Sequence, residues 1–522
     1  MWKFFSSIVR NISYLKMAIM KHPEKYILIL LLLIVQALCA QDRRSERIDS
    51  LVSVLAANKL FNGSILVAEH GRVIYRRSVG DIDFEHHIPN SDTTIFNLAS
   101  LSKPLTAVAV LQLVQKGKVK LDDPLSKYFK DFPYPEIQIR YLLSQSSGLP
   151  VQEKAEAPYI AAHPDEILNN QEVYAHLVAA KTPLLFPPGS NWGYNNTNYV
   201  LLALLVEKIG GRTFNAYMKA KVFRPAGMSK SYIRLAGMPN TPRYIIPNYY
   251  TSAYQNVDSL DHVQNYTFYN LGSLYGPANV MSTLQDLLKF DQALMAGKLI
   301  NKNLLKLAFS PLILNNGKVF HMGASTRSYG LGWNVYTSKT AHPDTMIFHD
   351  GHVVGITTVL HHNLSKDQTI IFYDNTNHAP LQLMVGISNI LNGISPGNFR
   401  VAQSLASVYG ETLVSNGINA AISKLLSLKS DTAHYYIDES EMNTLGFDLL
   451  NAPMPDHFAL SLEAFKINIL LFPKSGNAYD SYAQALEKAG DNNDALLMYQ
   501  KSLTLWPDNE EGKKAVKRLS GR

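Results

Sequence analysis

A serine and a lysine three positions apart, Ser100 and Lys103, are the residues best placed to do chemistry. They precede an apolar segment with helical periodicity that ends at Gly117, so we expect them at the entrance of a buried helix. Residues three apart share a helix face. A neutral lysine amine there could take the hydroxyl proton and make the serine a nucleophile. The simpler interpretation is a helix-capping serine beside a solvated lysine, which is the more frequent case for an isolated pair.

Two further groups could complete a site around this pair. Tyr194 and Asn196 are two residues apart on a loop, so both side chains can face one cleft. His349, Asp350 and Gly351 end an apolar segment with strand character, and a glycine there lets another backbone or a substrate approach closely. Each group also has a structural interpretation, as a turn with a packed tyrosine and as a buried histidine with satisfied hydrogen bonds.

The elements that must position these residues predict an α+β fold. The expected strands are 63–68, 72–76, 329–333, 345–349, 356–361 and 368–373. Sequential strands with short turns, such as the hairpin at His70 and Gly71, indicate an antiparallel sheet. Because strands lie at both ends of 41–395 with helices between them, the sheet is expected to combine N-terminal and C-terminal pieces.

The first 40 residues resemble a secretory signal peptide. A basic segment precedes an apolar run from Tyr26 to Val35, and small residues follow near Cys39 and Ala40. The alternative is a single-span membrane anchor, but the run is shorter than the ~20 apolar residues that a spanning helix needs. A lipid anchor on Cys39 is not expected, because Leu38 stands where lipoprotein signals have a small residue. We therefore expect an exported protein, held at the membrane only if the segment is not cleaved.

Composition argues against several other classes of protein. Residues 1–40 hold five basic and one acidic residue, so their removal lowers the formal charge from +7 to +3. This small charge gives no case for nucleic acid as a partner. The only cysteine lies in the signal segment, and the adjacent pair His361 and His362 would point to opposite faces of a strand. We expect neither a disulfide nor a metal site.

The chain changes to helical character at about residue 396. Four pairs of similar residues recur 34 positions apart: Phe465 and Tyr499, Ile469 and Leu503, Leu471 and Leu505, and Pro473 and Pro507. This period resembles the tetratricopeptide repeat. Such repeats need neighbouring helices to bury their apolar faces. We expect 396–522 to form an all-α repeat domain that docks on the body or holds a protein partner.

Taken together and in this order, Ser-x-x-Lys, Tyr-x-Asn and His-x-Gly resemble the motifs of the serine β-lactamase and penicillin-binding DD-peptidase superfamily. The resemblance is to the branch with class C β-lactamases and S12-type serine peptidases, and it covers roughly 45–395. It includes the Gly-Leu-Gly-Trp run that ends at Trp333. The resemblance implies an antiparallel sheet with helices on both faces, a helical subdomain and no cofactor.

The resemblance also implies a role for each residue of the motifs. Ser100 would attack a carbonyl carbon, while Lys103 and Tyr194 would share the roles of general base and acid. Asn196 would orient the lysine and contact the acyl side of the substrate. The oxyanion would lie between the backbone N–H groups of Ser100 and His352. Tyr194 would then activate the water that releases the acyl group.

Two positions depart from the family pattern. Gln145 stands where many relatives have histidine, and we expect it to affect loop structure rather than chemistry. Asp350 stands where relatives that bind β-lactams or D-Ala-D-Ala carry threonine or serine. Two like charges ~4 Å apart repel by about 4 kcal/mol at an effective dielectric constant near 20. A carboxylate at Asp350 therefore favours a neutral or cationic ester or amide as substrate.

These observations favour an exported serine hydrolase acting on a small peptide, a D-amino acid derivative or a carboxylester. One alternative is a true DD-carboxypeptidase or β-lactamase. Another is a non-catalytic protein that binds peptidoglycan or a peptide through its repeats. A tyrosine-rich stretch at 244–270 is either a wall of the cleft or a surface insertion.

Overall fold

The structure is a computed structural model. It describes residues 43–521, except for 59, 84–86, 235–237, 239–248, 253–254, 258–272, 324, 339–342, 354–355, 377–379, 400–401 and 453. The signal-like segment, and most of the tyrosine-rich stretch, lie outside the described residues.

Within the described residues, seven strands form one antiparallel sheet. In spatial order they are β10 (Ser328–Tyr329), β11 (Asn334–Thr337), β12 (Thr345–Val353), β13 (Ile356–Asn363), β14 (Gln368–Asp374), β1 (Gly63–Glu69) and β2 (Arg72–Val79). β1 pairs with β14 in a register that places Ser64 opposite Tyr373. The N-terminal hairpin is thus joined to the C-terminal strands, which confirms the predicted α+β class and its composite sheet.

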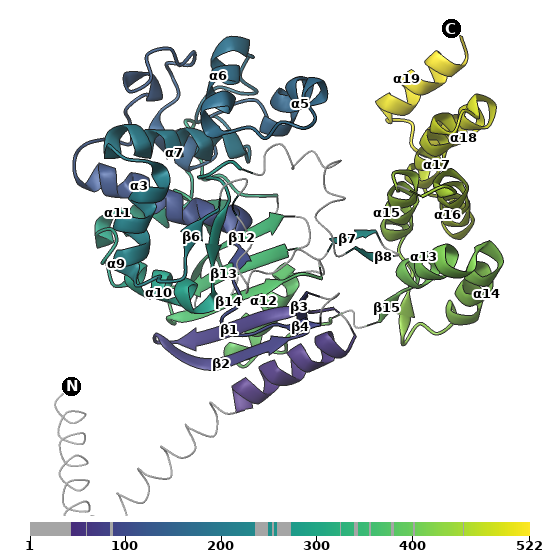
Figure 1. The fold of residues 1–522 in the computed structure, drawn as a ribbon, viewed down its shortest axis with the longest axis horizontal. Coiled ribbons are helices and arrows are strands. Elements are labelled where there is room, and N and C mark those ends of the chain that lie inside the picture. The colour runs from purple at the N-terminus through teal and green to yellow at the C-terminus, as the bar shows by residue number, and fades with distance from the viewer. Residues whose placement is uncertain are drawn as a thin grey trace, which may run out of the picture.

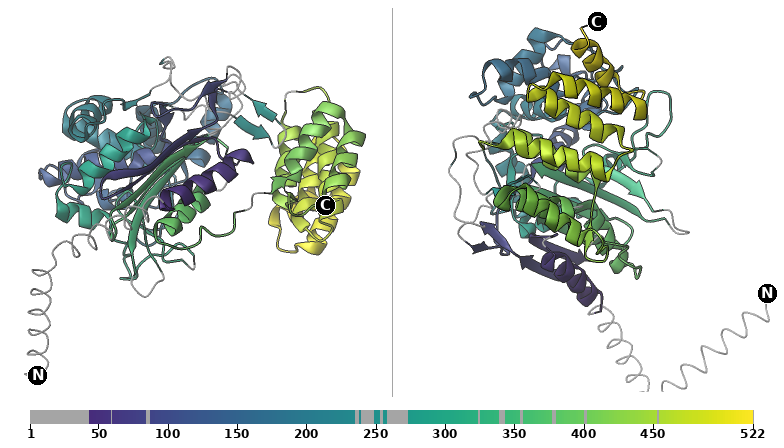
Figure 2. Two further views of the ribbon diagram at one scale, coloured as in Figure 1. Left: turned by 90° about the horizontal axis from the view of Figure 1, so that it is seen from below. Right: turned by 90° about the vertical axis from the view of Figure 1, so that its right-hand side faces the viewer.

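Helices cover both faces of this sheet (Figure 2). The body contains α3 (Ser102–Gln115), α4 (Ile139–Leu143), α5 (Gln152–Ala162), α6 (Asn170–Ala180), α7 (Asn196–Gly210), α8 (Phe214–Met218), α9 (Arg224–Ala226), α10 (Leu284–Met295), α11 (Lys302–Ala308) and α12 (Pro380–Leu391). Side chains of α3, α7 and α10 form the larger core on one face. The helix over 43–57 and α12 form a second core on the other. Because both faces are covered, every residue of β13 and β14 is buried.

A small sheet brings the start of α3 close to a distant segment of the chain. β9 (Val280–Ser282) pairs with both β5 (Phe96–Asn97) and β6 (Tyr232–Ile233). β5 leads through the short turn Ala99–Leu101 into α3, and the segment before β9 consequently lies beside the first turn of that helix. Shorter pairings join β3 (Asp81–Asp83) to β4 (Ile88–Pro89), β7 (Tyr249–Ser252) to β8 (Gln255–Val257), and β15 (Gln403–Ser404) to β16 (Tyr435–Tyr436).

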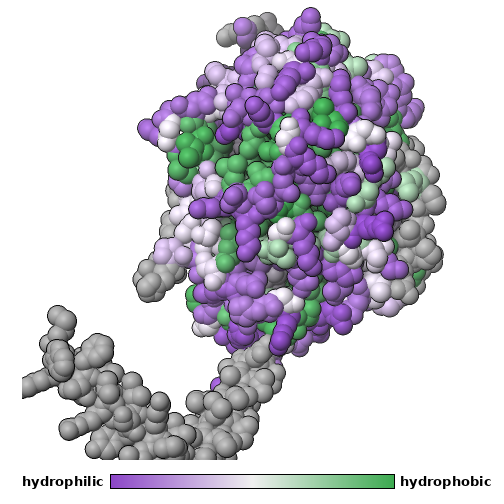
Figure 3. Space-filling view, turned by 90° about the vertical axis from the view of Figure 1, so that its left-hand side faces the viewer, coloured by the Kyte–Doolittle hydropathy of each residue, from purple (hydrophilic) through white to green (hydrophobic). Residues whose placement is uncertain are grey.

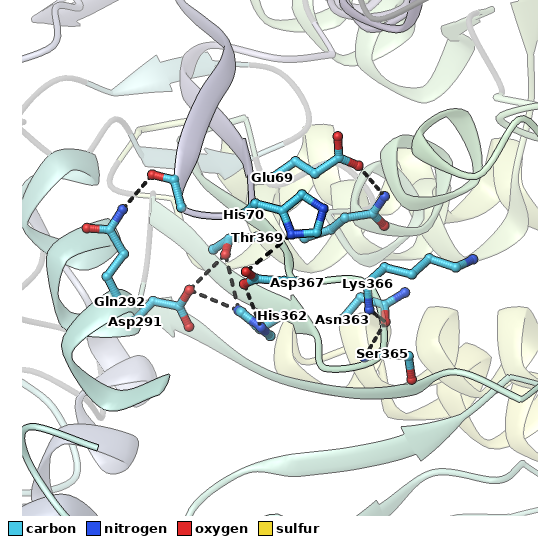
Figure 4. Close-up of polar contacts among 12 residues, drawn as sticks. Glu69, His70, Asp291, Gln292, His362, Asn363, Ser365, Lys366, Asp367 and Thr369 are labelled. Atoms are coloured by element: carbon cyan, nitrogen blue, oxygen red, sulfur yellow. Dashed lines mark hydrogen bonds and ion pairs between the residues drawn. The ribbon is translucent and has the colours of Figure 1, made fainter. Parts of the chain in front are cut away.

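A buried histidine–aspartate pair fastens α10 to the sheet (Figure 4). Asp291 of α10 accepts hydrogen bonds from His362 Nδ1 at 2.9 Å and from Thr369 Oγ1 at 2.7 Å, and all three side chains are buried. Burial opposes protonation of His362, but the charge and hydrogen bond of Asp291, together with the charge of Asp367, outweigh it and raise the pKa of the imidazole. His361 faces the other side of β13 and contacts the hydroxyl of Tyr336. The two histidines therefore point to opposite faces, as predicted.

The C-terminal part of the chain is almost entirely helical and lies to one side of the body (Figure 1). Its helices are α13 (Leu405–Asn416), α14 (Ile418–Leu428), α15 (Glu439–Leu450), α16 (His457–Leu471), α17 (Gly476–Lys488), α18 (Asn492–Leu505) and α19 (Glu510–Leu519). The first residues of α17 and α19 are 34 positions apart, which keeps the predicted period. The helical character is confirmed, while the assignment to the tetratricopeptide repeat stays a prediction.

The surface of the body away from these helices is mostly hydrophilic, with apolar side chains visible in patches between hydrophilic ones (Figure 3). Within the described part of the chain, no helix combines the length and the hydrophobicity that crossing a membrane requires.

Candidate active site

Ser100 lies on a short 3₁₀ turn, Ala99–Leu101, that runs into α3. The turn begins with Ala99 in the left-handed region at a φ of 46°, a conformation that costs a non-glycine residue about 1–2 kcal/mol. The side chain of Asn97 holds it there by accepting the Ala99 N–H at 2.8 Å. The N-cap of α3 is Leu101, not Ser100. The interpretation of Ser100 as a helix cap is therefore wrong, and Ser100 lines a cavity instead.

Lys103 lies one turn further on and is fully buried, so the alternative of a solvated lysine is also wrong. Its Nζ lies 2.9 Å from Ser100 Oγ, 2.8 Å from Asn196 Oδ1 and 3.1 Å from the carbonyl oxygen of Pro277. The amide and carbonyl oxygens can only accept, and they take up two N–H directions of the amine. A neutral amine in this position presents its lone pair toward the serine hydroxyl.

Tyr194 lies in the loop before α7, and Asn196 is the first residue of that helix. The centroid of the Tyr194 ring lies 4.7 Å from Lys103 Nζ, and the tyrosine side chain is 39% exposed. Between them, Asn195 caps α7 by accepting the Thr197 N–H at 2.9 Å. This cap turns the chain so that the residues on either side of it both reach Lys103.

Gln145 holds the loop around Tyr194 in place by hydrogen bonds. Its side chain is fully buried, and Oε1 accepts hydrogen bonds from the Asn195 N–H at 3.0 Å and from Asn198 Nδ2 at 2.5 Å. Its backbone carbonyl accepts the Gly193 N–H at 2.8 Å. Gln145 thus holds both sides of Tyr194 in place and does not line the cavity, in agreement with the structural role expected for it.

His349 of β12 is buried and neutral. Its Nδ1–H donates to the carbonyl oxygen of Asp350 at 2.6 Å, and Nε2 accepts from the hydroxyl of Tyr329 at 3.0 Å. Burial of the ring lowers the pKa of His349 to about 4. Burial also raises the pKa of Tyr329 well above its usual value, so this hydroxyl keeps its proton. With both ring nitrogens engaged, His349 supports the strand and supplies no positive charge to the cavity at neutral pH.

Gly351 is required by the close approach of β12 to the turn that carries Ser100. A β-carbon at this position would lie 2.0 Å from the carbonyl oxygen of Leu98. The same oxygen accepts a hydrogen bond from Thr358 Oγ1 of β13 at 2.9 Å. The sheet and the nucleophile turn are thus in direct contact, which fixes the position of Ser100 relative to β12.

These elements enclose a cavity of about 440 Å³. It is lined by Ser100, Trp192, Tyr194, Asn196, Arg327, Tyr329, Asn334, His349, Asp350 and His352. Six of the eight residues predicted from the sequence are therefore at the cavity wall. The other two support it from behind, since Lys103 contacts Ser100 and Gly351 packs on the nucleophile turn.

Four lining residues were not predicted: Trp192, Arg327, Tyr329 and Asn334. Trp192 precedes Tyr194 by two positions and Arg327 precedes Tyr329 by two, and residues two apart on extended chain share a side. For Trp192, its spacing from Tyr194 was the available signal. Arg327, Tyr329 and Asn334 reach the cavity through the pairing of β10, β11 and β12, which spacing alone does not predict. Among the residues that the structure describes, no three His, Cys, Asp or Glu side chains come together as metal ligands would.

Comparison with known proteins places this site in a family. The pattern of the Beta-lactamase family matches residues 48–385. Penicillin-binding protein 4* of Bacillus subtilis is 31% identical over 340 residues, which make up 64% of this chain and 72% of the relative. Esterase EstB of Burkholderia gladioli is 34% identical over 197 residues, which make up 35% of this chain and 50% of the esterase.

The fold is shared with solved structures. The structure of the penicillin-binding protein homologue from Pyrococcus abyssi superposes with a TM-score of 0.57 at 24% identity, over 67% of this chain and 78% of the homologue. The family match spans more than half of the chain and contains the whole cavity. The chain therefore belongs to the beta-lactamase family and is a serine hydrolase of that family.

Proposed function

We propose that this protein is an exported hydrolase that cleaves a small ester or amide through an acyl-enzyme on Ser100. The observation that carries the proposal is the contact of 2.9 Å between Lys103 Nζ and Ser100 Oγ at the wall of an open cavity. In this proposal residues 41–395 form the catalytic body, and 1–40 direct export. Residues 396–522 hold a protein partner or dock on the body.

In the first half-reaction, Ser100 Oγ attacks the carbonyl carbon of the substrate while its proton passes to the Lys103 and Tyr194 pair. The backbone N–H groups of Ser100 and His352 receive the oxyanion that forms. When the tetrahedral intermediate collapses, the bond to the leaving alcohol or amine breaks. The same pair returns the proton to the leaving group, so Ser100 is left as an acyl ester.

In the second half-reaction, water attacks the acyl ester and gives a proton to Tyr194. Collapse of the second intermediate releases the carboxylic acid and returns a proton to Ser100 Oγ. The net reaction is addition of one water across the ester or amide bond. Asn196 acts by holding the amine of Lys103, through its 2.8 Å contact, in line with the hydroxyl.

The charges of the cavity support a choice among substrates. Asp350 lines the wall, and the neighbouring His349 is neutral and cannot offset its charge. A substrate with a carboxylate at this point would be repelled, so we propose a neutral or cationic group there. Arg327 also lines the cavity, and it supports the alternative of a carboxypeptidase that binds its substrate carboxylate away from Asp350.

Hydrolysis of a panel of esters, D-amino acid amides and β-lactams tests the proposed function. We expect turnover of at least one ester or amide by the full chain, loss of that turnover in Ser100→Ala, and wild-type rates in Ser427→Ala, which changes an exposed serine of the C-terminal helices. If Ser100→Ala keeps the activity, or if β-lactams are the best substrates, the proposal is wrong.

A further inference from the structure

Two opposite charges face the same cavity without neutralising one another. Asp350 and Arg327 both line it, and among the described residues neither side chain has an ion-pair partner. Arg327 is held by other contacts: its Nε donates to Asn334 Oδ1 at 2.9 Å, and its guanidinium carbon lies 5.0 Å from the centroid of the Phe348 ring. These contacts fix the position of the guanidinium and leave its charge uncompensated.

The neighbouring His349 adds no charge to the cavity beside those of Asp350 and Arg327. His349 donates from Nδ1 and accepts at Nε2, so it is neutral in this arrangement. Of the described residues that line the cavity, Asp350 carries the only carboxylate and Arg327 the only permanent positive charge. The wall therefore offers one site for a cation and one for an anion.

The charge of the ligand decides how well it can fill such a cavity. A neutral ligand removes water from both charged groups and gives them nothing in return, which is unfavourable. A ligand with one charge pairs with one group but leaves the other unpaired or repels it. A ligand with one charge of each sign satisfies both. The cavity, at about 440 Å³, is near the small end of ligand pockets, so both charges must belong to one small molecule.

We propose that the substrate is a small zwitterion, an amino acid derivative of dipeptide size. Its ammonium group pairs with Asp350, its carboxylate pairs with Arg327, and the scissile bond between them lies at Ser100. Hydrolysis adds one water across that bond and gives two amino-acid-sized products. This inference rests on the proposed function and deepens it, because it assigns Arg327 and Asp350 as the residues that select the substrate.

Three forms of one dipeptide test the proposal: alanyl-alanine in its four stereoisomers, the N-acetylated form without the ammonium, and the C-terminal amide without the carboxylate. With the full chain we expect kcat/KM for at least one free dipeptide to exceed that for either blocked form by tenfold or more. No hydrolysis of any free dipeptide, or no preference for it over the blocked forms, would overturn the proposal.

Charge-removing variants assign the preference to the two residues. In Asp350→Asn the preference for the free dipeptide over its N-acetylated form should fall at least tenfold. In Arg327→Gln the preference over the amide should fall likewise. Arg72→Gln, which removes an exposed surface charge, should keep both wild-type ratios. Ratios that stay at the wild-type values in Asp350→Asn and Arg327→Gln contradict the assignment.

The two levels of the proposal fail separately. If a fluorophosphonate probe labels Ser100 but the zwitterion preference is absent, the substrate assignment is wrong and the hydrolase stands. If Ser100 is not labelled, the proposed function itself is wrong.

Discussion

Replacing Gly351 with alanine tests whether contact between the sheet and the nucleophile turn positions Ser100. The added methyl group would lie 2.0 Å from the carbonyl oxygen of Leu98 and 3.0 Å from the backbone nitrogen of Leu101. Leu98 precedes the turn that carries Ser100, and Leu101 is its last residue. Contacts under 3.0 Å are essentially absent from real structures, so β12 and the turn must separate by about 1 Å to accept the methyl group.

That separation has two measurable consequences. Overpacking of this kind costs about 1–3 kcal/mol of unfolding free energy. A misplacement of about 1 Å in a catalytic group costs on the order of a hundredfold in rate. We therefore expect Gly351→Ala to lower kcat/KM about a hundredfold while the protein stays folded.

The assay compares kcat/KM for an ester that the wild type hydrolyses with the unfolding free energy from urea titration. Gly393→Ala is the matched control. Unlike Gly351, Gly393 has a positive φ, of 75°, and its β-carbon would meet no atom within 4 Å. Gly393→Ala should therefore lose about 1–2 kcal/mol of stability from the left-handed conformation and keep its activity. Wild-type kcat/KM in Gly351→Ala would refute the role given to this contact.

Three further variants test other parts of the structure. Asp291→Asn removes a charge that raises the pKa of His362. The stability that this raised pKa contributes is fully present below the histidine pKa of the unfolded chain and is lost as pH rises through the pKa of the folded protein. The loss in urea midpoint relative to wild type should therefore be larger at pH 6 than at pH 9, and an equal loss would contradict the stabilising role of the Asp291–His362 pair. Gln145→Ala leaves buried donors of the Tyr194 loop unpaired, so calorimetry should show a loss of about 1–3 kcal/mol; an unchanged melting temperature would contradict its bracing role. Asn196→Ala should lower kcat by on the order of a hundredfold, because the amine of Lys103 loses an acceptor that orients it; kcat within twofold of wild type would refute that role.

Local pattern was enough to predict much of the fold and of the site. The apolar runs of β1, β13 and β14 and the hairpin signal at His70 and Gly71 are short-range patterns, and these strands formed where expected. The spacing of Ser100 and Lys103 is likewise local, and it gave their contact correctly.

The expected strand at 329–333 did not form as one element. β10 ends at Tyr329 and β11 begins at Asn334, because the chain turns at Gly332 with a φ of 104°. A β-carbon at Gly332 would lie 2.6 Å from that of Ala107 in α3. Glycine is therefore needed where this turn packs against α3. The contact joins residues far apart in the sequence, and hydrophobic periodicity cannot reveal it.

The same limit applies to the charges of the cavity. Arg327 reaches it only because β10, β11 and β12 pair side by side. Side chains alternate along a strand, which correctly predicts that His361 and His362 lie on opposite faces. The alternation does not predict that His362 pairs with Asp291, 71 positions away. Sequence spacing predicts which face a residue occupies, and only the assembled sheet determines what it meets there.

The most direct test of the central claim is mass spectrometry of the full chain after reaction with a fluorophosphonate probe. An acyl-enzyme mechanism at Ser100 predicts one adduct, which peptide mapping places on Ser100 and which Ser100→Ala abolishes. No adduct on the wild type, or equal labelling of the Ser100→Ala variant, would contradict it.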